Sequence, residues 1–282
     1  MVLEIYTGVK KRKMAKAFVI CFVTVMILIL VFVASVVVWP FCTMQKYPSL
    51  LHTAKLCLTT TPSRLRDPWI LKNIQGMRDL HGHSGVILSI PHVFKKTGEP
   101  YEVPVCLQDL PGLRILRCED EGPGTKLLSP LRESSVTSDT ILMICDDDVT
   151  YNQDTFYHLA MAVIRDPFSM HCMCYKRVMG FMGYGSKKET LLPLLLLPVP
   201  EICFTVDDDF VNAGMEKLGI PLKKTSIPWC SLNCGACAVD AVSTTGGPQF
   251  RKGGLFYEDI LSSKSRFAKT AACREEVWNS PP

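Results

Sequence analysis

The sequence carries little net charge outside its first sixteen residues. The chain has 282 residues and a net charge of +4, and five basic side chains with one acidic side chain in residues 1–16 account for that excess. The rest is balanced and lacks the basic footprint of a nucleic-acid-binding protein, so no nucleic-acid partner is expected. A hydrophobic fraction of 48% and a charged fraction of 21% argue against a disordered or collagen-like chain.

Charged residues are absent from Ala17 to Trp39, and this apolar run is long enough to cross a hydrocarbon layer of about 30 Å as a helix. A buried globular helix is rarely apolar on every face for so long, and a cleaved signal peptide usually has only about 7–15 apolar residues. Basic residues before the run predict a cytoplasmic N-terminus. We therefore expect a single-pass type II membrane protein, with a basic cytoplasmic tail (1–16), a transmembrane signal-anchor (17–39), a short stem (40–54) and a luminal remainder.

The cysteines match no standard zinc pattern. The chain has 13 Cys, and one of them lies in the predicted span, which leaves an even number for an oxidising compartment. The densest group is Cys230, Cys234 and Cys237, with Cys273 further on, and it lacks the two-plus-two ligand spacing of zinc sites. Disulfides or buried thiols are favoured over zinc, and residues 226–282 are expected to form a Cys-containing extension of unknown role.

Short apolar runs alternate with helical patterns from residue 55 to residue 225. Successive strand and helix units predict an α/β domain with a doubly wound, mostly parallel sheet. Asp67 and Pro68 are a typical N-cap and first residue of a helix. The leucine run 191–197 is too short to cross a membrane and is expected to pack on the core. Strands are predicted at 56–61, 85–90, 113–118 and 140–145, and helices at 69–80 and 125–131.

Three adjacent aspartates follow the fourth predicted strand. Asp146, Asp147 and Asp148 come directly after an apolar run, and open α/β sheets bind ligands outside the carboxyl ends of their strands. Adjacent carboxylates repel each other, and a divalent cation would neutralise them. Because oxygen ligands suit Mg²⁺ or Mn²⁺, we expect Asp146 and Asp148 to hold such an ion. The alternative is a solvated acidic turn that caps the next helix.

The same aspartates fit two kinds of enzyme. Asp146, Asp148 and Thr150 satisfy the D-x-D-x-T signature of haloacid-dehalogenase-type phosphatases, in which Asp146 would be the nucleophile. That fold normally carries the signature on its first strand, whereas three predicted strands precede it here. A glycosyltransferase instead uses a D-x-D motif and its metal to hold a nucleotide diphosphate, with a nucleotide-binding half before the motif and an acceptor-binding half after it.

Several short motifs follow one another in order between residues 55 and 225. They are TTTPSR (59–64), ILSIP (87–91), FKKTGEPY (94–101), RCEDEGPGTKLL (117–128), DDD (146–148) with Tyr151, CFTVDDD (203–209) and GIP (219–221). Their combination resembles a group of GT-A-type glycosyltransferase-like proteins from algae, protists and large viruses. The resemblance implies a GT-A-like fold and a nucleotide-sugar-dependent transferase with a divalent metal. We place Thr60, Asp146 and Asp147 among the donor-binding residues.

Two further features suit an anionic donor. Gly122, Pro123 and Gly124 precede a predicted helix, where backbone N–H groups and the helix dipole favour an anion. Lys126, one turn into that helix, either reaches a diphosphate as a point charge or is an ordinary solvated lysine. Arg64, after the first strand, is either a nucleotide contact or a surface charge.

A second acidic cluster begins a predicted helix about sixty residues after the first. An inverting transferase needs one carboxylate to take the proton of the acceptor hydroxyl. Asp207, Asp208 and Asp209 are the candidates, and we choose Asp208 as the base. The alternative role of this cluster is to cap the helix.

The sequence thus predicts a metal-dependent, inverting glycosyltransferase that moves a sugar from a nucleotide-sugar donor to a hydroxyl group of a glycan, protein or lipid acceptor. Two alternatives stay open. One is a haloacid-dehalogenase-like phosphatase, and the other is a catalytically inactive sugar-binding or scaffold protein.

Overall fold

The computed structural model describes residues 19–34, 51–80, 82, 84–151, 155–173, 177–225 and 263–281, which belong to two compact units, Met1–Ser49 and Leu50–Pro282. In the first unit, residues 19–34 are helical and their side chains are exposed. Within the described ranges, no helix combines the length and apolar character needed to cross a membrane. The transmembrane segment predicted at 17–39 is therefore not confirmed. The predicted tail (1–16) and most of the predicted stem (40–54) lie outside the described residues.

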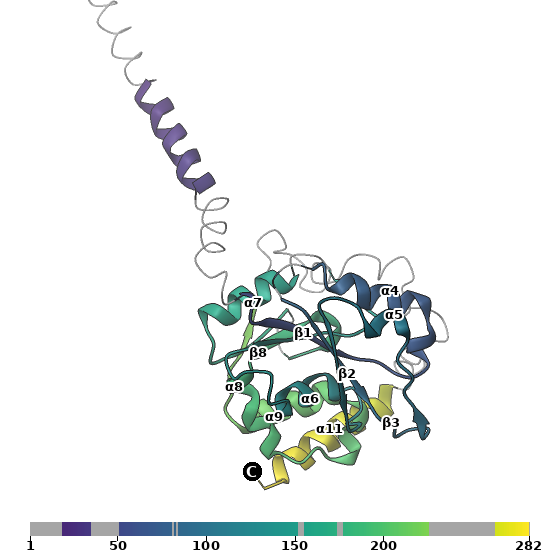
Figure 1. The fold of residues 1–282 in the computed structure, drawn as a ribbon. Helices are drawn as coiled ribbons and strands as arrows, with labels where there is room; N and C mark the ends of the chain where they lie inside the picture. Colours follow the sequence, from purple (N-terminus) through teal and green to yellow (C-terminus); the bar gives the residue numbers. More distant parts are fainter. Residues whose placement is uncertain are drawn as a thin grey trace, which may run out of the picture. The chain divides into compact units, whose positions relative to one another are not determined.

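A mostly parallel sheet forms the centre of the second unit (Figure 1). Its strands are β1 (Ala54–Thr59), β2 (Val86–Pro91), β5 (Leu113–Cys118), β6 (Ile141–Ile144), β7 (Met170–Cys172), β8 (Tyr184–Lys187) and β9 (Leu222–Lys224), in the order β5-β2-β1-β6-β8-β7-β9. Neighbours from β5 to β6 are parallel, β8 is antiparallel to β6 and β7, and β7 is parallel to β9. The predicted α/β class and mostly parallel sheet are confirmed. A separate small sheet pairs β3 (Val93–Phe94) with β4 (Glu99–Pro100).

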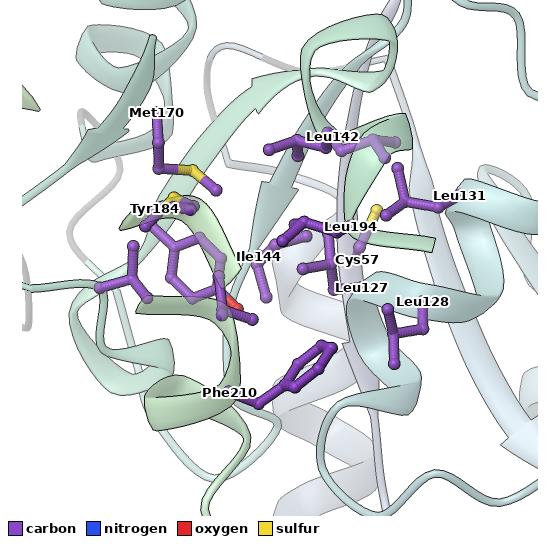
Figure 2. Close-up of a cluster of buried hydrophobic side chains, with 14 of the residues drawn as sticks. Cys57, Leu127, Leu128, Leu131, Leu142, Ile144, Met170, Tyr184, Leu194 and Phe210 are labelled. Atoms are coloured by element: carbon purple, nitrogen blue, oxygen red, sulfur yellow. The ribbon is translucent and has the colours of Figure 1, made fainter. Parts of the chain in front are cut away.

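Alternate strand residues contribute to two hydrophobic clusters, one on each face of the sheet. Leu56 and Leu58 pack with the helices α4 (Pro68–Met77) and α7 (Thr155–Arg165). Cys57 packs on the opposite face with α6 (Thr125–Arg132) and α9 (Asp207–Lys217). Helices thus cover both faces, as expected for a doubly wound sheet. Figure 2 shows the second cluster, in which Leu127, Leu128 and Phe210 of the helices pack with strand residues that include Ile144 and Tyr184.

Two sequence signals predicted for the second unit are observed. Asp67 caps α4 by accepting a hydrogen bond from the Trp69 N–H at 2.8 Å, and Pro68 is the first helical residue. The leucine run forms α8 (Lys188–Leu191) and η4 (Leu192–Leu196), with Leu191, Leu194 and Leu197 in the core as predicted. The remaining elements are η2 (Arg64–Arg66), α5 (Val105–Gln108), η3 (Gly180–Met182), η5 (Glu201–Thr205) and α11 (Ser263–Asn279).

The C-terminal helix α11 is fastened to α9 and η5. A disulfide joins Cys203 of η5 to Cys273 of α11 across 70 residues of sequence. The Lys217 ammonium at the end of α9 donates to the Val277 carbonyl at 2.9 Å. Within the extension predicted at 226–282, residues 263–281 are described, and they complete the cluster that also contains Phe210. Cys230, Cys234 and Cys237 lie outside the described residues.

We expect Cys203→Ser or Cys273→Ser to lower the free energy of unfolding by about 2–5 kcal/mol, because the crosslink restricts the unfolded chain over a long loop. Thermal unfolding with and without reductant measures this effect. Cys106 is an exposed free cysteine, and Cys106→Ser is the matched control that should melt like the wild type. Equal melting temperatures for the reduced and oxidised wild-type protein would contradict the prediction.

Candidate active site

The two predicted ligand-binding segments meet at one edge of the sheet. Strands β1 and β6 are parallel neighbours in register, with Cys57 opposite Ile144, so their carboxyl ends lie together. Arg64 follows β1 on η2, and Asp146 follows β6 after the buried Cys145. The expected position of the first acidic cluster, at the carboxyl edge of a parallel sheet, is therefore observed.

Arg64 holds the second and third aspartates of this cluster. Its Nη1 donates to Asp147 Oδ1 and its Nη2 to Asp148 Oδ2, each at 2.6 Å. The two carboxylates are 2% and 8% exposed, whereas the Arg64 side chain is 40% exposed. Burial, together with the neighbouring Asp147 charge, raises the pKa of Asp148 to about 7 even though Arg64 opposes the shift. Asn73 of α4 fixes the turn by donating to the Asp147 and Val149 carbonyls at 2.7 and 2.9 Å.

Lys126 of α6 connects the first acidic cluster with the second. Its ammonium donates to Asp146 Oδ1 at 2.8 Å and lies 3.0 Å from Asp207 Oδ2. The lysine side chain is only 5% exposed, compared with 26% for Asp146 and 12% for Asp207. Burial disfavours the ammonium, but the carboxylates of Asp146, Asp207 and Asp208 raise its pKa well above the usual value. Lys126 is therefore a buried, charged group, in contrast to the solvated helix lysine that was its alternative.

Gly180 brings the backbone of η3 against this ion pair. Both carboxylate oxygens of Asp208 lie 3.1 Å from the Gly180 nitrogen and accept its N–H. The Tyr151 hydroxyl donates to the Gly180 carbonyl and accepts from the Asp146 N–H, both at 2.8 Å. A Cβ at position 180 would lie 2.4 Å from Asp146 Oδ1 and 2.6 Å from Lys126 Nζ. Sequence reasoning missed the roles of Gly180, Tyr151 and Asn73.

The carboxyl group of Asp208 lies beside that of Asp207 and has a raised pKa. Burial, with the adjacent Asp207 charge, raises the pKa of Asp208 to about 8, against the opposing effects of Lys126 and the Gly180 N–H. Asp207 and Asp208 occupy the first turn of α9, but the N-cap residue is Val206, and no side chain caps the helix. The capping role considered for this cluster is therefore not observed.

Asp209, Thr60 and Gly122 are the remaining predicted site residues. Asp209 accepts from the Thr270 hydroxyl of α11 at 2.8 Å and lies 3.7 Å from Arg177 Nη1, so it faces away from Lys126. Thr60 is buried, and its carbonyl accepts from the Tyr101 hydroxyl at 3.1 Å. The third residue is Gly122, at the start of α6.

Gly122 joins α6 to η5. Its N–H donates to Asp120 Oδ1 at 2.8 Å, its φ is +63°, and a Cβ there would lie 2.0 Å from the Phe204 carbonyl oxygen. The N–H groups of Thr125 and Lys126 donate to the carbonyls of Gly122 and Pro123. These N–H groups already have acceptors, and the anion site predicted at this helix start stays a prediction. The glycine is required for its positive φ and for the close approach of η5.

The carboxylates as arranged do not fit the divalent ion that the sequence predicted. Asp146 is bonded to Lys126, and Asp148 is bonded to Arg64, so the two predicted ligands face different cations. Over the described ranges, no group of three or more His, Cys, Asp or Glu side chains is placed to hold a metal ion. The Mn²⁺ or Mg²⁺ site is therefore not confirmed.

A pocket of about 1,080 Å³ lies apart from these aspartates, none of which lines it. Its lining includes apolar side chains of η4 and η5, among them Leu196 and Phe204, and several basic side chains. The Lys95 ammonium is 5.9 Å from the centre of the Phe204 ring. The basic residues that line the pocket are Lys95, Lys96, Arg132 and Lys269, and Arg132 is paired with Glu121.

We expect the stability of the protein without added ligand to fall as the pH rises from about 4 to about 8. The pKa values of Asp148 and Asp208 are raised from 3.8 to about 7 and about 8, so the folded protein binds more protons than the unfolded chain in this interval. Raising the pH then favours the unfolded state. Melting temperatures across this pH range measure the slope, which should be shallower in Asp208→Asn. An identical slope in the variant would contradict the assignment.

Comparisons with known proteins identify no family. No family model matches the chain, and no curated protein matches it. Solved structures with a similar chain path include a 4-diphosphocytidyl-2C-methyl-D-erythritol synthase, at 10% identity and a TM-score of 0.40, covering 62% of this chain and 88% of that one. Glucosyl-3-phosphoglycerate synthase from Mycobacterium tuberculosis aligns at 13% identity and a TM-score of 0.41, covering 62% and 71%. The same synthase in complex with UDP aligns at 15% and 0.47, covering 79% and 80%. Similarity at this level identifies neither a family nor a function.

Proposed function

We propose that this protein is a glycosyltransferase that transfers a sugar from a nucleotide-sugar donor to a hydroxyl group of an acceptor. The observation that carries the proposal is the convergence of two distant aspartate clusters on Lys126 at the carboxyl edge of a mostly parallel sheet. Ligands of open α/β sheets bind at this edge. The order of sequence motifs that resembles GT-A-type proteins supports a nucleotide sugar as the ligand.

Arg64 and Lys126 are the cations proposed to act on the donor. Negative charge develops on the diphosphate as the bond to the anomeric carbon breaks, and positive side chains placed beforehand stabilise that charge. Arg64 is 40% exposed and offers a planar guanidinium suited to phosphate oxygens. Lys126 is more deeply buried. The diphosphate would approach it beside Asp146, whose side chain is 26% exposed. Thr60 and Asp147 would line the donor site beside Arg64.

Asp208 is proposed as the base of an inverting reaction. The acceptor oxygen bonds to the anomeric carbon while the bond to the diphosphate breaks, and the proton of the acceptor hydroxyl passes to the Asp208 carboxylate. A pKa near 8 makes this carboxylate a stronger base than an ordinary aspartate, whose pKa is 3.8. The acceptor is a glycan, protein or lipid hydroxyl.

We also propose that the second unit works in an oxidising compartment, the Golgi lumen. The Cys203–Cys273 disulfide supports this placement, because disulfides persist in such compartments and are rare in the cytosol. Protease protection of the full-length protein in sealed microsomes tests the placement. Digestion of the second unit without detergent would contradict it.

Thermal unfolding of the full-length protein with a panel of UDP- and GDP-sugars tests the function. A bound donor raises the apparent stability by RT ln(1 + [L]/Kd). The correct nucleotide sugar should therefore raise the melting temperature more than the free nucleosides do. Incubation with that donor should then release a nucleoside diphosphate. A phosphorylated Asp146 after incubation with a phosphate ester would favour the phosphatase, and binding without turnover would favour the inactive sugar-binding protein.

A further inference from the structure

The Lys126 ammonium lies among carboxylates of both acidic clusters. Three carboxylates approach one position from two elements: Asp146 follows β6, and Asp207 and Asp208 begin α9. The Lys126 ammonium is within 3.0 Å of the first two and forms ion pairs with both. Gly180 closes a further side, since a Cβ there would be 2.6 Å from Nζ.

The lysine is fixed in this position by the fold. Every residue of α6 from Thr125 to Leu131 is buried, and Leu127 and Leu128 pack in the cluster of Figure 2. The helix therefore cannot shift without disturbing the core. A divalent ion and an ammonium repel each other, so they compete for the same carboxylates. Arg64 neutralises Asp147 and Asp148 in the same way, which leaves each aspartate of the first cluster bonded to a side-chain cation.

We propose that Lys126 is the resident cation of this acidic cluster and replaces a divalent ion, so that the protein binds the diphosphate of its donor without metal. The exclusion of metal by Lys126 stands on the geometry of the cluster alone. The binding of a diphosphate rests on the proposed function. The two parts are therefore tested separately.

The first test measures Mn²⁺ binding to the full-length protein by electron paramagnetic resonance and by calorimetry. Wild type should show no Mn²⁺ site that depends on Asp146. Lys126→Ala removes the ammonium and leaves the carboxylates, so it should gain such a site and melt at a higher temperature when Mn²⁺ is added. Lys126→Arg keeps the charge and should gain none. The double variant Lys126→Ala with Asp146→Asn should lose the gained site.

Two results of this test would overturn the proposal. One is a wild-type Mn²⁺ site that disappears in Asp146→Asn, and this readout needs no Lys126 variant to fold. The other is a folded Lys126→Ala protein, with a wild-type circular dichroism spectrum, that binds no Mn²⁺.

The second test measures UDP binding to the full-length protein in EDTA and in Mn²⁺. Wild type should bind UDP equally well in both solutions, whereas Lys126→Ala should lose binding in EDTA and recover it when Mn²⁺ is supplied. UDP binding by the wild type only in the presence of Mn²⁺ would overturn the proposal. If UDP and the nucleotide-sugar panel fail to bind under every condition, the proposed function fails, while the Mn²⁺ measurements still decide the role of Lys126.

Discussion

Replacing Asp208 by Asn should reduce sugar transfer by roughly 10²–10⁴-fold, the usual contribution of a general base. The amide is close to the carboxylate in size and keeps an oxygen that can accept the Gly180 N–H, so the fold and UDP binding should survive. What the variant loses is a group that can take a proton. Because the pKa of Asp208 is about 8, wild-type transfer should increase with pH up to that region, and the variant should lack this increase.

The two neighbouring aspartates provide matched controls for this variant. Asp209 contacts Thr270 and Arg177, so Asp209→Asn should keep near-normal transfer. Asp207 lies against Lys126, and its charge raises the pKa of Asp208. Asp207→Asn should therefore change UDP binding and shift the increase of transfer to lower pH without abolishing it. Steady-state transfer rates between pH 5 and pH 9, with UDP titrations, separate these effects. Wild-type transfer in Asp208→Asn, or equal losses in all three variants, would rule out Asp208 as the base.

The strands that the sequence predicted are those with a long apolar run and a clear stop. The runs that became β2 and β5 coincide closely with the observed strands, because Pro91 ends one and a polar loop follows the other. Strands β7 and β8 contain only three and four residues, which is too short for an alternating pattern to be recognised. The antiparallel placement of β8 therefore could not be predicted.

The two acidic clusters are visible in the sequence, but the partners that their carboxylates bind are decided by tertiary structure. Lys126 could be noted as a cation near a helix start, yet its contact with Asp207 requires α6 to pack on the same face of the sheet as α9. Helical geometry separates the three aspartates of the second cluster. Successive residues of a helix point about 100° apart, so Asp209 turns toward α11 while Asp207 faces Lys126. The sequence alone does not show which way each of the three aspartate side chains points, so it could not separate their roles.

The disulfide illustrates a limit of a different kind. Twelve cysteines beyond the apolar run permit many pairings, and spacing alone grouped Cys273 with Cys230, Cys234 and Cys237. Its observed partner is Cys203, which lies 70 residues away in sequence and close in space only because α11 packs against η5 and α9. Connectivity of this kind depends on how the helices dock.

Gly180→Ala should lower transfer by on the order of 10²-fold, the loss that a displacement of about 1 Å in a reacting group can cause. The added Cβ would lie 2.4 Å from Asp146 Oδ1 and 2.6 Å from Lys126 Nζ, so the ion pair has to move apart. Both displaced atoms are the ends of side chains, so the backbone should keep its course and the protein should remain folded.

Gly76→Ala in α4 is the matched control, because a Cβ there meets nothing within 4 Å. It should keep full transfer and gain about 0.4–1 kcal/mol in the free energy of unfolding, since alanine restricts the unfolded chain more than glycine does. Transfer rates, UDP affinity and melting temperatures of the two variants, measured side by side, separate local displacement from a general effect of adding a methyl group. Full transfer and unchanged UDP affinity in Gly180→Ala would show that the Lys126–Asp146 contact does not position the reacting groups. Unfolding of that variant would show that η3 has no room for the added methyl group. Gly180 would then be needed for stability, and a role in positioning the reacting groups would be rejected.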